Sequence, residues 1–325
     1  MKYTVILIFA ILLLSSCVME KEIPRSLTGP YLGQQTPPDS AELFAPGIIS
    51  TQMYTRDITF TPDGKEIYFC VSALGYNLIY TTREVDGVWT EPEVATFITD
   101  EKYMFYEPHI SADGMTLFFL SDMPAQEGEP ATQDIWAVDR SGDGWGKPYN
   151  LGLPINTEAA EFYPSTTVDG TLYFTRAAKG SRIHHIYRSR KIEGKYQEPE
   201  KLGAEVNCGT NRYNAFIDPH ERFIIVPAVG MEDSRGGTDY YISFRSENDE
   251  WSDPVNMGDR VTSRDAREYS TSLSPDGKYL FFMSAKVEGE TSSDYKKLLE
   301  AFQSPLNGNS NIWWIKSDFI WTLKK

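Results

Sequence analysis

The sequence predicts an all-β fold built from one repeated strand-turn-strand unit. A tight turn recurs at positions 63, 113, 169, 220 and 276, so that successive turns are 50 to 56 residues apart. A run rich in β-branched and aromatic residues follows each turn, as expected for the second strand of a hairpin. Units of four strands at this spacing predict a β-propeller with five blades, closed into a ring by a strand near the N-terminus.

Each predicted blade contains a hairpin turn between its first and second strands. Asp-Gly favours such turns because glycine readily adopts the positive φ angle that they require. The turns are Thr61-Pro62-Asp63-Gly64, Ala112-Asp113-Gly114, Val168-Asp169-Gly170, Asp218-Pro219-His220-Glu221 and Ser274-Pro275-Asp276-Gly277. The second strands that follow are residues 66–69, 116–119, 171–174, 223–226 and 279–282.

Two further strands complete each blade. The third strand recurs at 77–80, 134–136, 185–187, 239–242 and 311–314. The fourth begins at an aromatic residue three positions before a proline, as in Trp89 with Pro92. The fifth unit has no such motif after Trp314, whereas residues 42–50 resemble the fourth-strand endings of other blades. We therefore expect this N-terminal segment to complete the last blade, which leaves no exposed sheet edge.

One insertion interrupts the repeat. Residues 288–309 separate the second and third strands of the last blade. Within it, residues 294–302 carry apolar side chains at helical spacing and few strand formers. This pattern predicts a short helix lying over one face of the ring.

The repeat motifs resemble those of a known family. The Pro-Asp-Gly turn, the Asp-Ile-Trp third strand at 134–136 and the Trp-x-x-Pro fourth strand at 89–92 are similar to the TolB-like, WD40-like propeller repeat, and the resemblance covers residues 40–320. Such modules commonly mediate protein contacts, so the resemblance implies a binding or scaffold protein. TolB-like proteins more often have six blades, whereas this sequence contains five units.

The N-terminus has the features of an export signal. Lys2 precedes an apolar run, Val5 to Leu14, that is too short to span a bilayer as a stable helix. Residues 14–17, Leu-Ser-Ser-Cys, resemble the bacterial lipobox, which implies cleavage before Cys17 and a diacylglycerol on its sulfur. We expect a signal peptide at 1–16, a lipidated cysteine and flexible tether at 17–40, and a single propeller domain at 41–325.

Lipidation would tether the exported protein to a membrane rather than embed it. A lipobox followed by propeller repeats is similar to lipoproteins of Bacteroidetes, which implies the outer membrane and leaves its periplasmic and surface faces open. The chain has 46 acidic and 31 basic residues and a formal net charge of −15. This charge excludes nucleic acid as a partner and repels the chain as a whole from anionic membrane surfaces. The oligomeric state is left open.

The two remaining cysteines lie in different repeats, Cys70 in a predicted strand and Cys208 in a predicted loop. A disulfide between them and two free thiols both remain open. The sequence has no cysteine cluster of the kind that binds metals, and we expect neither a metal nor a cofactor.

The candidate site lies at the start of the first strands, which line the axis of a propeller. Counting back six residues from each turn gives only polar residues, and alternation places the residues eight back on the same face. Seven back gives one arginine and four aromatic residues. The three sets are Asp57, Glu107, Tyr163, Asn214 and Ser270; Thr55, Phe105, Glu161, Arg212 and Glu268; and Arg56, Tyr106, Phe162, Tyr213 and Tyr269.

This mixture of carboxylates, arginines and tyrosines suits a hydroxylated ligand such as a sugar, because rings stack on aromatic faces and charged groups hydrogen-bond hydroxyls. The predicted ligand-binding residues are Arg56, Asp57, Tyr106, Glu107, Tyr163, Arg212, Asn214, Glu268 and Tyr269.

Two classes of function fit these residues. The first is a binding or scaffold module of the cell envelope that recognises a glycan, a peptide or a partner protein at the channel mouth. The alternative is a carbohydrate-active enzyme. A glycosidase would use two of Asp57, Glu107, Glu161 and Glu268 as acid and base. A uronate lyase would use Tyr163 or His109 to remove a proton. Whether the protein is an enzyme is left open.

Overall fold

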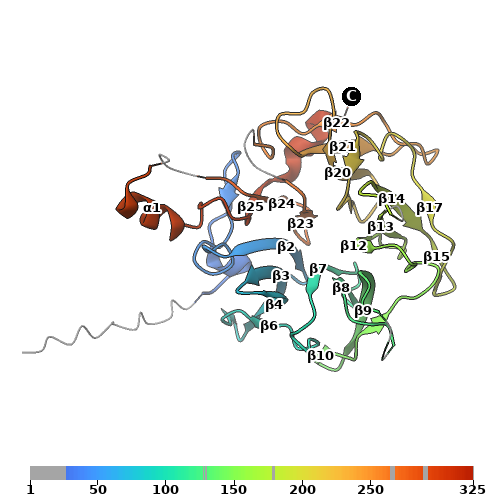
Figure 1. Cartoon of the computed structure of the whole chain (residues 1–325), viewed down its shortest axis with the longest axis horizontal. Coiled ribbons are helices and arrows are strands. Elements are labelled where there is room, and N and C mark those ends of the chain that lie inside the picture. The colour runs from blue at the N-terminus through green and yellow to red at the C-terminus, as the bar shows by residue number, and fades with distance from the viewer. Residues whose placement is uncertain are drawn as a thin grey trace, which may run out of the picture.

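The computed structural model describes residues 27–126, 128, 130–177, 180–263, 268–287 and 292–324. Five antiparallel sheets stand around a central axis, and the chain runs through them in sequence order (Figure 1). The predicted fold, a five-bladed β-propeller, is confirmed. The signal peptide, the lipidated cysteine and the first part of the tether lie outside the described residues.

The blades follow the predicted repeat. Blade 1 holds β2 (Tyr54–Phe60), β3 (Glu66–Ala73), β4 (Tyr76–Val85), β5 (Val88–Trp89) and β6 (Glu93–Val94). Blade 2 holds β7 (Phe105–Ile110), β8 (Thr116–Ser121), β9 (Asp134–Ser141), β10 (Gly144–Trp145) and β11 (Tyr149–Asn150). Blade 3 holds β12 (Glu161–Thr166), β13 (Leu172–Ala177), β14 (His184–Ser189) and β17 (Glu200–Lys201), with a side hairpin of β15 (Lys191–Ile192) and β16 (Lys195–Tyr196).

In blade 4 the first strand is split in two. This blade holds β18 (Asn211–Arg212), β19 (Phe216–Ile217), β20 (Phe223–Val229), β21 (Asp239–Phe244) and β22 (Val255–Asn256). Blade 5 holds β23 (Thr271–Leu273), β24 (Tyr279–Ser284), β25 (Asn311–Lys316) and the N-terminal β1 (Glu42–Leu43). Two short 3-10 helices, η1 (Pro30–Gly33) and η2 (Ser317–Leu323), lie before and after the strands.

Four of the five turns share one hydrogen-bonding pattern. In the first, the Asp63 carboxylate accepts hydrogen bonds from the Thr61 hydroxyl at 2.6 Å and the Lys65 amide at 3.1 Å. Gly64 has φ +69°, the conformation that the Asp-Gly motif predicts. The same contacts recur at Asp113, Asp169 and Asp276. Turn geometry therefore accounts for these aspartates.

The ring closes through its N-terminal strand, as predicted. β1 pairs antiparallel with β25, with Glu42 opposite Trp314, and the Phe44 amide donates to the Ile312 carbonyl at 2.8 Å. Phe44 is fully buried and packs edge-on against Phe281 and Trp314, with ring centroids 5.0 and 5.2 Å apart. Each such aromatic pair contributes about 1 kcal/mol beyond its buried area.

The insertion forms the predicted helix, α1 (Tyr295–Phe302), and the Asp294 carboxylate caps it by accepting from the Lys297 amide at 3.0 Å. Its expected position was wrong. α1 lies outside the ring rather than over a face of it (Figure 1), and none of its residues is buried. Within the described residues, no helix is both long and apolar enough to cross a membrane.

Both cysteines in the described part of the chain are buried free thiols. Cys70 belongs to the core between blades 1 and 2, whereas Cys208 packs with Ala228 and Tyr241 in blade 4. Of the two alternatives that the sequence left open, free thiols are therefore the correct one.

Candidate functional site

In the first strand of most blades, the alternation of side chains between the two faces of the strand is interrupted at the candidate site. Asp57, Glu107, Tyr163 and Asn214, all six residues before a turn, have φ angles of 50 to 57°. Only a few per cent of non-glycine residues adopt this left-handed conformation. In blades 1 to 3 the pairing with the second strand shifts at these positions, which are β-bulges. Residues on either side of the bulge therefore do not alternate as a regular strand requires.

One open cavity of about 450 Å³ lies at the mouth of the channel. It is lined by all five of the residues that lie seven positions before a turn: Arg56, Tyr106, Phe162, Tyr213 and Tyr269. The bulge residues Glu107 and Asn214 also reach it. Its full lining is Arg56, Met104, Tyr106, Glu107, Leu120, Gln133, Ala160, Phe162, Ala177, His184, Tyr213, Asn214 and Tyr269.

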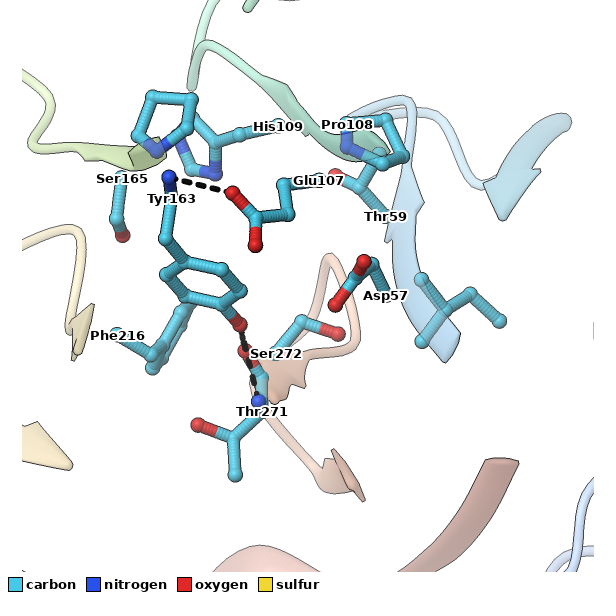
Figure 2. Close-up of a pocket in the computed structure, with 12 residues that line it drawn as sticks. Asp57, Thr59, Glu107, Pro108, His109, Tyr163, Ser165, Phe216, Thr271 and Ser272 are labelled. Carbon is cyan, nitrogen blue, oxygen red and sulfur yellow. Dashed lines mark hydrogen bonds between the residues drawn. The ribbon is translucent and has the colours of Figure 1, made fainter. Parts of the chain in front are cut away.

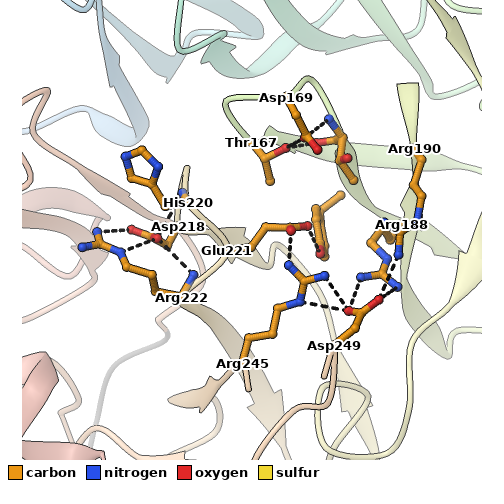
Figure 3. A network of polar contacts seen from close by, with 12 residues as sticks. Thr167, Asp169, Arg188, Arg190, Asp218, His220, Glu221, Arg222, Arg245 and Asp249 are labelled. Carbon is orange, nitrogen blue, oxygen red and sulfur yellow. Dashed lines mark hydrogen bonds and ion pairs between the residues drawn. The ribbon is translucent and has the colours of Figure 1, made fainter. Parts of the chain in front are cut away.

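A second, far smaller space lies deeper along the channel (Figure 2). It measures about 20 Å³ and is lined by Asp57, Glu107, His109 and Tyr163 among others. A space of that size holds about one water molecule. The channel is thus nearly closed where these side chains converge, and the mouth cavity has a floor.

An ionic cluster forms that floor. The Arg56 guanidinium donates through Nε to Asp57 at 2.5 Å and through Nη2 to Glu107 at 2.8 Å. The second Glu107 oxygen accepts from the Tyr163 amide at 2.7 Å, and Asn214 Nδ2 lies 3.4 Å from the first. Side chains and backbone of blades 1 to 4 therefore meet at one carboxylate. This contact stabilises the ring at its centre.

The ring of contacts continues through blade 5. The Ser270 hydroxyl donates to Asp57. The Tyr163 hydroxyl donates to the Thr271 carbonyl at 2.9 Å and accepts from the Thr271 amide at 3.0 Å. Asp57, Glu107 and Tyr163 are all less than 8 % exposed. Their polar atoms are engaged by protein partners, which leaves little capacity to bind a ligand directly.

Burial changes the acid–base properties of the cluster. Burial raises the pKa of Glu107 to about 7, against the opposing effect of Arg56. Burial also lowers the pKa of Arg56, but the carboxylates of Asp57 and Glu107 outweigh it and the net shift is upward. The three groups together are close to neutral when Glu107 is protonated and carry one negative charge when it is ionised.

Aromatic rings form the walls of the mouth cavity. The Arg56 guanidinium lies between the rings of Tyr106 and Tyr269, 5.2 and 4.8 Å from their centroids. His184 lies edge-on between Phe162 and Tyr213, with ring centroids 5.3 and 6.1 Å away, and Tyr213 in turn packs edge-on against Tyr269 at 6.4 Å. These edge-on contacts fix the rings relative to one another. The cavity therefore presents preformed aromatic walls above a polar floor.

His109, considered as a lyase base, is held deep in the channel. Its Nε2 accepts a hydrogen bond from the Thr166 amide at 2.8 Å. Burial lowers the pKa of His109 to about 4. Burial also raises the pKa of Tyr163 far above its usual range. Both groups lie at the small inner space, where a sugar does not fit.

Three predicted site residues line neither cavity. Glu161 pairs with Arg176 at 2.7 Å. Arg212 donates to the backbone carbonyls of Cys208 and His184 at 2.8 and 3.0 Å and to that of Gly209. Glu268 accepts from the Ser263 amide at 3.1 Å and the Ser284 hydroxyl at 3.1 Å. These three side chains are buried and hold loops in place.

Three aromatic cavity residues are absent from the predicted set: Phe162, Tyr213 and His184. The first two were visible in the sequence as members of the set seven before a turn, where four of five residues are aromatic. His184 comes from β14, and the repeat pattern gives no sign of its position. Among the described residues, no group of three or more His, Cys, Asp or Glu side chains could hold a metal ion.

Comparisons with known proteins bear on the fold alone. No family model and no curated protein matches the chain. Similar solved structures include one assigned as TolB from Agrobacterium tumefaciens, with 14 % identity, a TM-score of 0.47, and coverage of 81 % of this chain and 90 % of that one. TolB from Acinetobacter baumannii has 14 % identity and a TM-score of 0.44, over 81 % of this chain and 54 % of that one.

A luciferin-regenerating enzyme is similar at 13 % identity and a TM-score of 0.45, over 84 % of this chain and 94 % of that one. On the pairing of its own strands, the chain is a five-bladed β-propeller, and TolB structures are among those that it resembles.

Proposed function

We propose that this protein is a glycan-binding module of the bacterial cell envelope, which holds the end of a neutral sugar chain in the cavity at its channel mouth. One observation carries the proposal: the five residues seven before a turn, an arginine and four aromatics, converge on one cavity of about 450 Å³. This volume lies in the range of small-molecule sites, and its mixed lining suits a ligand with both apolar faces and hydroxyls.

The floor of the cavity favours the end of a chain over its middle. Beneath the mouth, the channel narrows to a space of about 20 Å³, so a ligand has no exit on the far side. The lining includes four aromatic rings from neighbouring blades, Tyr106, Phe162, Tyr213 and Tyr269, and Tyr213 packs edge-on against Tyr269 with ring centroids 6.4 Å apart. A sugar ring that enters from solvent would stack on a wall, with its hydroxyls near the polar floor.

The charge of the floor favours an uncharged sugar. Arg56 is the one Lys or Arg among the described lining residues, and two carboxylates neutralise it. Above pH 7, ionised Glu107 leaves the cluster with excess negative charge, since its pKa is about 7. A uronate or another acidic sugar would be repelled there. Neutral hexoses do not experience this repulsion.

The contacts of the acidic residues favour binding over catalysis. Asp57 and Glu107 share one arginine, Glu161 bonds to Arg176 and Thr157, and Glu268 bonds to Ser263, and neither Glu161 nor Glu268 lines the cavity. A glycosidase acid must be free to protonate a leaving group and its partner to reach the sugar. We therefore place the four carboxylates in support of the fold and assign recognition to the aromatic ring.

The proposed location rests on the N-terminal sequence. Lipidation of Cys17 and attachment to the outer membrane follow from the lipobox resemblance. Growth with an alkyne-bearing fatty acid, followed by coupling to a dye, should label the protein, and Cys17→Ser should lose the label. A chain that carries no acyl group in whole-protein mass spectrometry would contradict the anchor and leave the binding proposal standing.

Binding is tested by screening the purified chain on a glycan array and titrating the best neutral glycan by calorimetry. Stacking on one aromatic ring is worth about 1 kcal/mol, so Phe162→Ala and Tyr213→Ala should each weaken binding about fivefold. Tyr149, 42 % exposed on an outer strand, supplies the matched control: Tyr149→Ala should bind as the unaltered chain does.

Two results would overturn the proposal. One is a ligand whose affinity is the same for Tyr213→Ala and Tyr149→Ala, which would place recognition elsewhere. The other is release of sugar product that stops in Glu107→Gln while binding persists, which would show a glycosidase instead. A ligand that proves to be a peptide, bound with the same dependence on Phe162 and Tyr213, would keep the site and change its ligand class.

A further inference from the structure

α1 carries an apolar face that no part of the described chain covers. Tyr295, Leu298, Leu299 and Phe302 are 78, 56, 42 and 66 % exposed. Their spacing of three and four residues places them on one stripe of the helix. A short helix in a soluble protein is normally stabilised by burying such a stripe. Here the stripe faces solvent, which marks it as a contact surface.

The base of the insertion is firmly attached to the ring. Asn307 and Asn309 both donate to the Gln52 carbonyl, at 3.1 and 2.9 Å, and Asn311 donates to the Thr51 carbonyl at 3.0 Å. The arm that returns from α1 is thereby fixed to the loop entering blade 1. Figure 1 shows α1 projecting from the ring on the side of β1 and β25.

The described chain enters the ring in the same sector. The Leu27 carbonyl accepts from the Trp89 amide at 2.9 Å and the Gly29 carbonyl from Trp89 Nε1 at 2.8 Å, which fixes the N-terminal segment to blade 1. The segment then crosses to blade 5 as β1. Cys17 is ten residues before Leu27, so a lipid there would keep this junction within about 35 Å of the bilayer.

A bilayer fits the stripe better than a second copy of the chain does. A helix of eight residues is about 12 Å long, whereas a stable protein interface buries about 800 Å² on each partner. A lipid surface needs no complementary shape. The chain has a net charge of −15, and Asp294 and Glu300 match the charges of Lys296 and Lys297 beside the stripe, so the stripe suits a zwitterionic lipid surface rather than an anionic one.

We propose that α1 inserts its apolar stripe into the surface of the membrane to which the chain is anchored. This inference rests on the proposed lipid anchor and is independent of the sugar site. The lipid anchor and α1 would then both contact the membrane near the junction of blades 5 and 1. This junction would face the bilayer, and the channel mouth would open to solvent in a direction parallel to the membrane surface. The anchor raises the local concentration of lipid around α1, so a short helix suffices.

The test uses the full-length acylated protein reconstituted in phosphatidylcholine vesicles, with an environment-sensitive fluorophore on Leu299→Cys. The native Cys70 and Cys208 are buried and so label poorly. Spin-labelled lipids should quench the fluorophore at least twofold. The same label on Ile192→Cys, 54 % exposed in blade 3, should not be quenched. Adding Leu298→Glu and Phe302→Glu should abolish quenching at position 299 with no change in circular dichroism, since both side chains are exposed.

Equal, weak quenching at positions 299 and 192 would overturn the inference. A second result would also overturn it. If spin-labelled lipids do not quench the label at position 299, and iodide in solution quenches it only after the protein is diluted, then a second copy of the chain covers α1. Whole-protein mass spectrometry separates a failure of the anchor from a failure of α1. If no acyl group is found, flotation of the protein with vesicles is the deciding measurement. Flotation that is lost in Phe302→Glu would support insertion of α1 into the membrane, and a chain that does not float would contradict it.

Discussion

Four residues along the channel hold a left-handed backbone although none of them is glycine. Asp57, Glu107, Tyr163 and Asn214 occupy the same place in successive blades. Such a conformation costs about 1 kcal/mol or more per residue, and the hydrogen bonds of the Arg56 cluster offset this cost. The bulges turn the preceding residue toward the mouth, so they decide which side chains a ligand meets.

Glu107 should make stability depend on pH. Its pKa is about 7 in the folded protein and about 4.3 in an unfolded chain. Below the unfolded value both states are protonated and there is no penalty. As pH rises from about 4.3 to 7, the unfolded state ionises first, so folding loses stability. In thermal unfolding from pH 4.5 to 8, the stability of Glu107→Gln relative to the unaltered chain should increase across this window. A constant difference between the two would contradict the raised pKa.

Arg212 should matter for stability and not for binding. It is 4 % exposed and donates to three backbone carbonyls. Arg212→Ala leaves those carbonyls without their partner, which should cost about 3 kcal/mol in urea unfolding. The folded variant should retain the glycan affinity of the unaltered chain in calorimetry. If Arg212→Ala folds but no longer binds the glycan, the prediction is wrong and Arg212 belongs to the binding site.

Among the elements, β1 has the largest structural role for its length. It is two residues long, yet it completes blade 5 and joins the two ends of the ring. The aromatic cluster of Phe44, Phe281 and Trp314 beside it lies at the seam between blades 5 and 1. Closure by a strand from the opposite end of the chain removes the open edge that blade 5 would otherwise present.

Truncation of Phe44 should therefore destabilise the whole ring. Phe44 is fully buried, and Phe44→Ala should cost about 3–5 kcal/mol of unfolding free energy. Val168, 59 % exposed in a turn, is the matched control, and Val168→Ala should change stability by less than about 0.5 kcal/mol. Guanidinium unfolding followed by tryptophan fluorescence measures both. A Phe44→Ala protein as stable as the control would mean that β1 adds little to closure.

For the whole molecule, the fold could be predicted and the site only in part. Turn chemistry and strand patterns are local, so the Asp63 and Asp276 turns and the pairing of residues 42–50 with the last blade followed from the sequence. The bulges depend on contacts that are distant in the sequence. Non-glycine residues adopt the left-handed backbone conformation of the bulges only when neighbouring blades supply stabilising hydrogen bonds. Strict alternation therefore suggested Arg212 and Glu268 as ligand contacts, whereas Tyr213 was left out although it belongs to the mostly aromatic set seven residues before a turn.

The central claim is that a ligand binds at the channel mouth between the aromatic walls. A crystal structure of the chain with the glycan selected on the array tests it most directly. We predict electron density for a terminal neutral sugar stacked on Phe162 or Tyr213, above the Arg56 cluster and with the deeper channel closed. Density on another surface, such as the outer groove beside Trp251, with an empty mouth cavity would contradict the account.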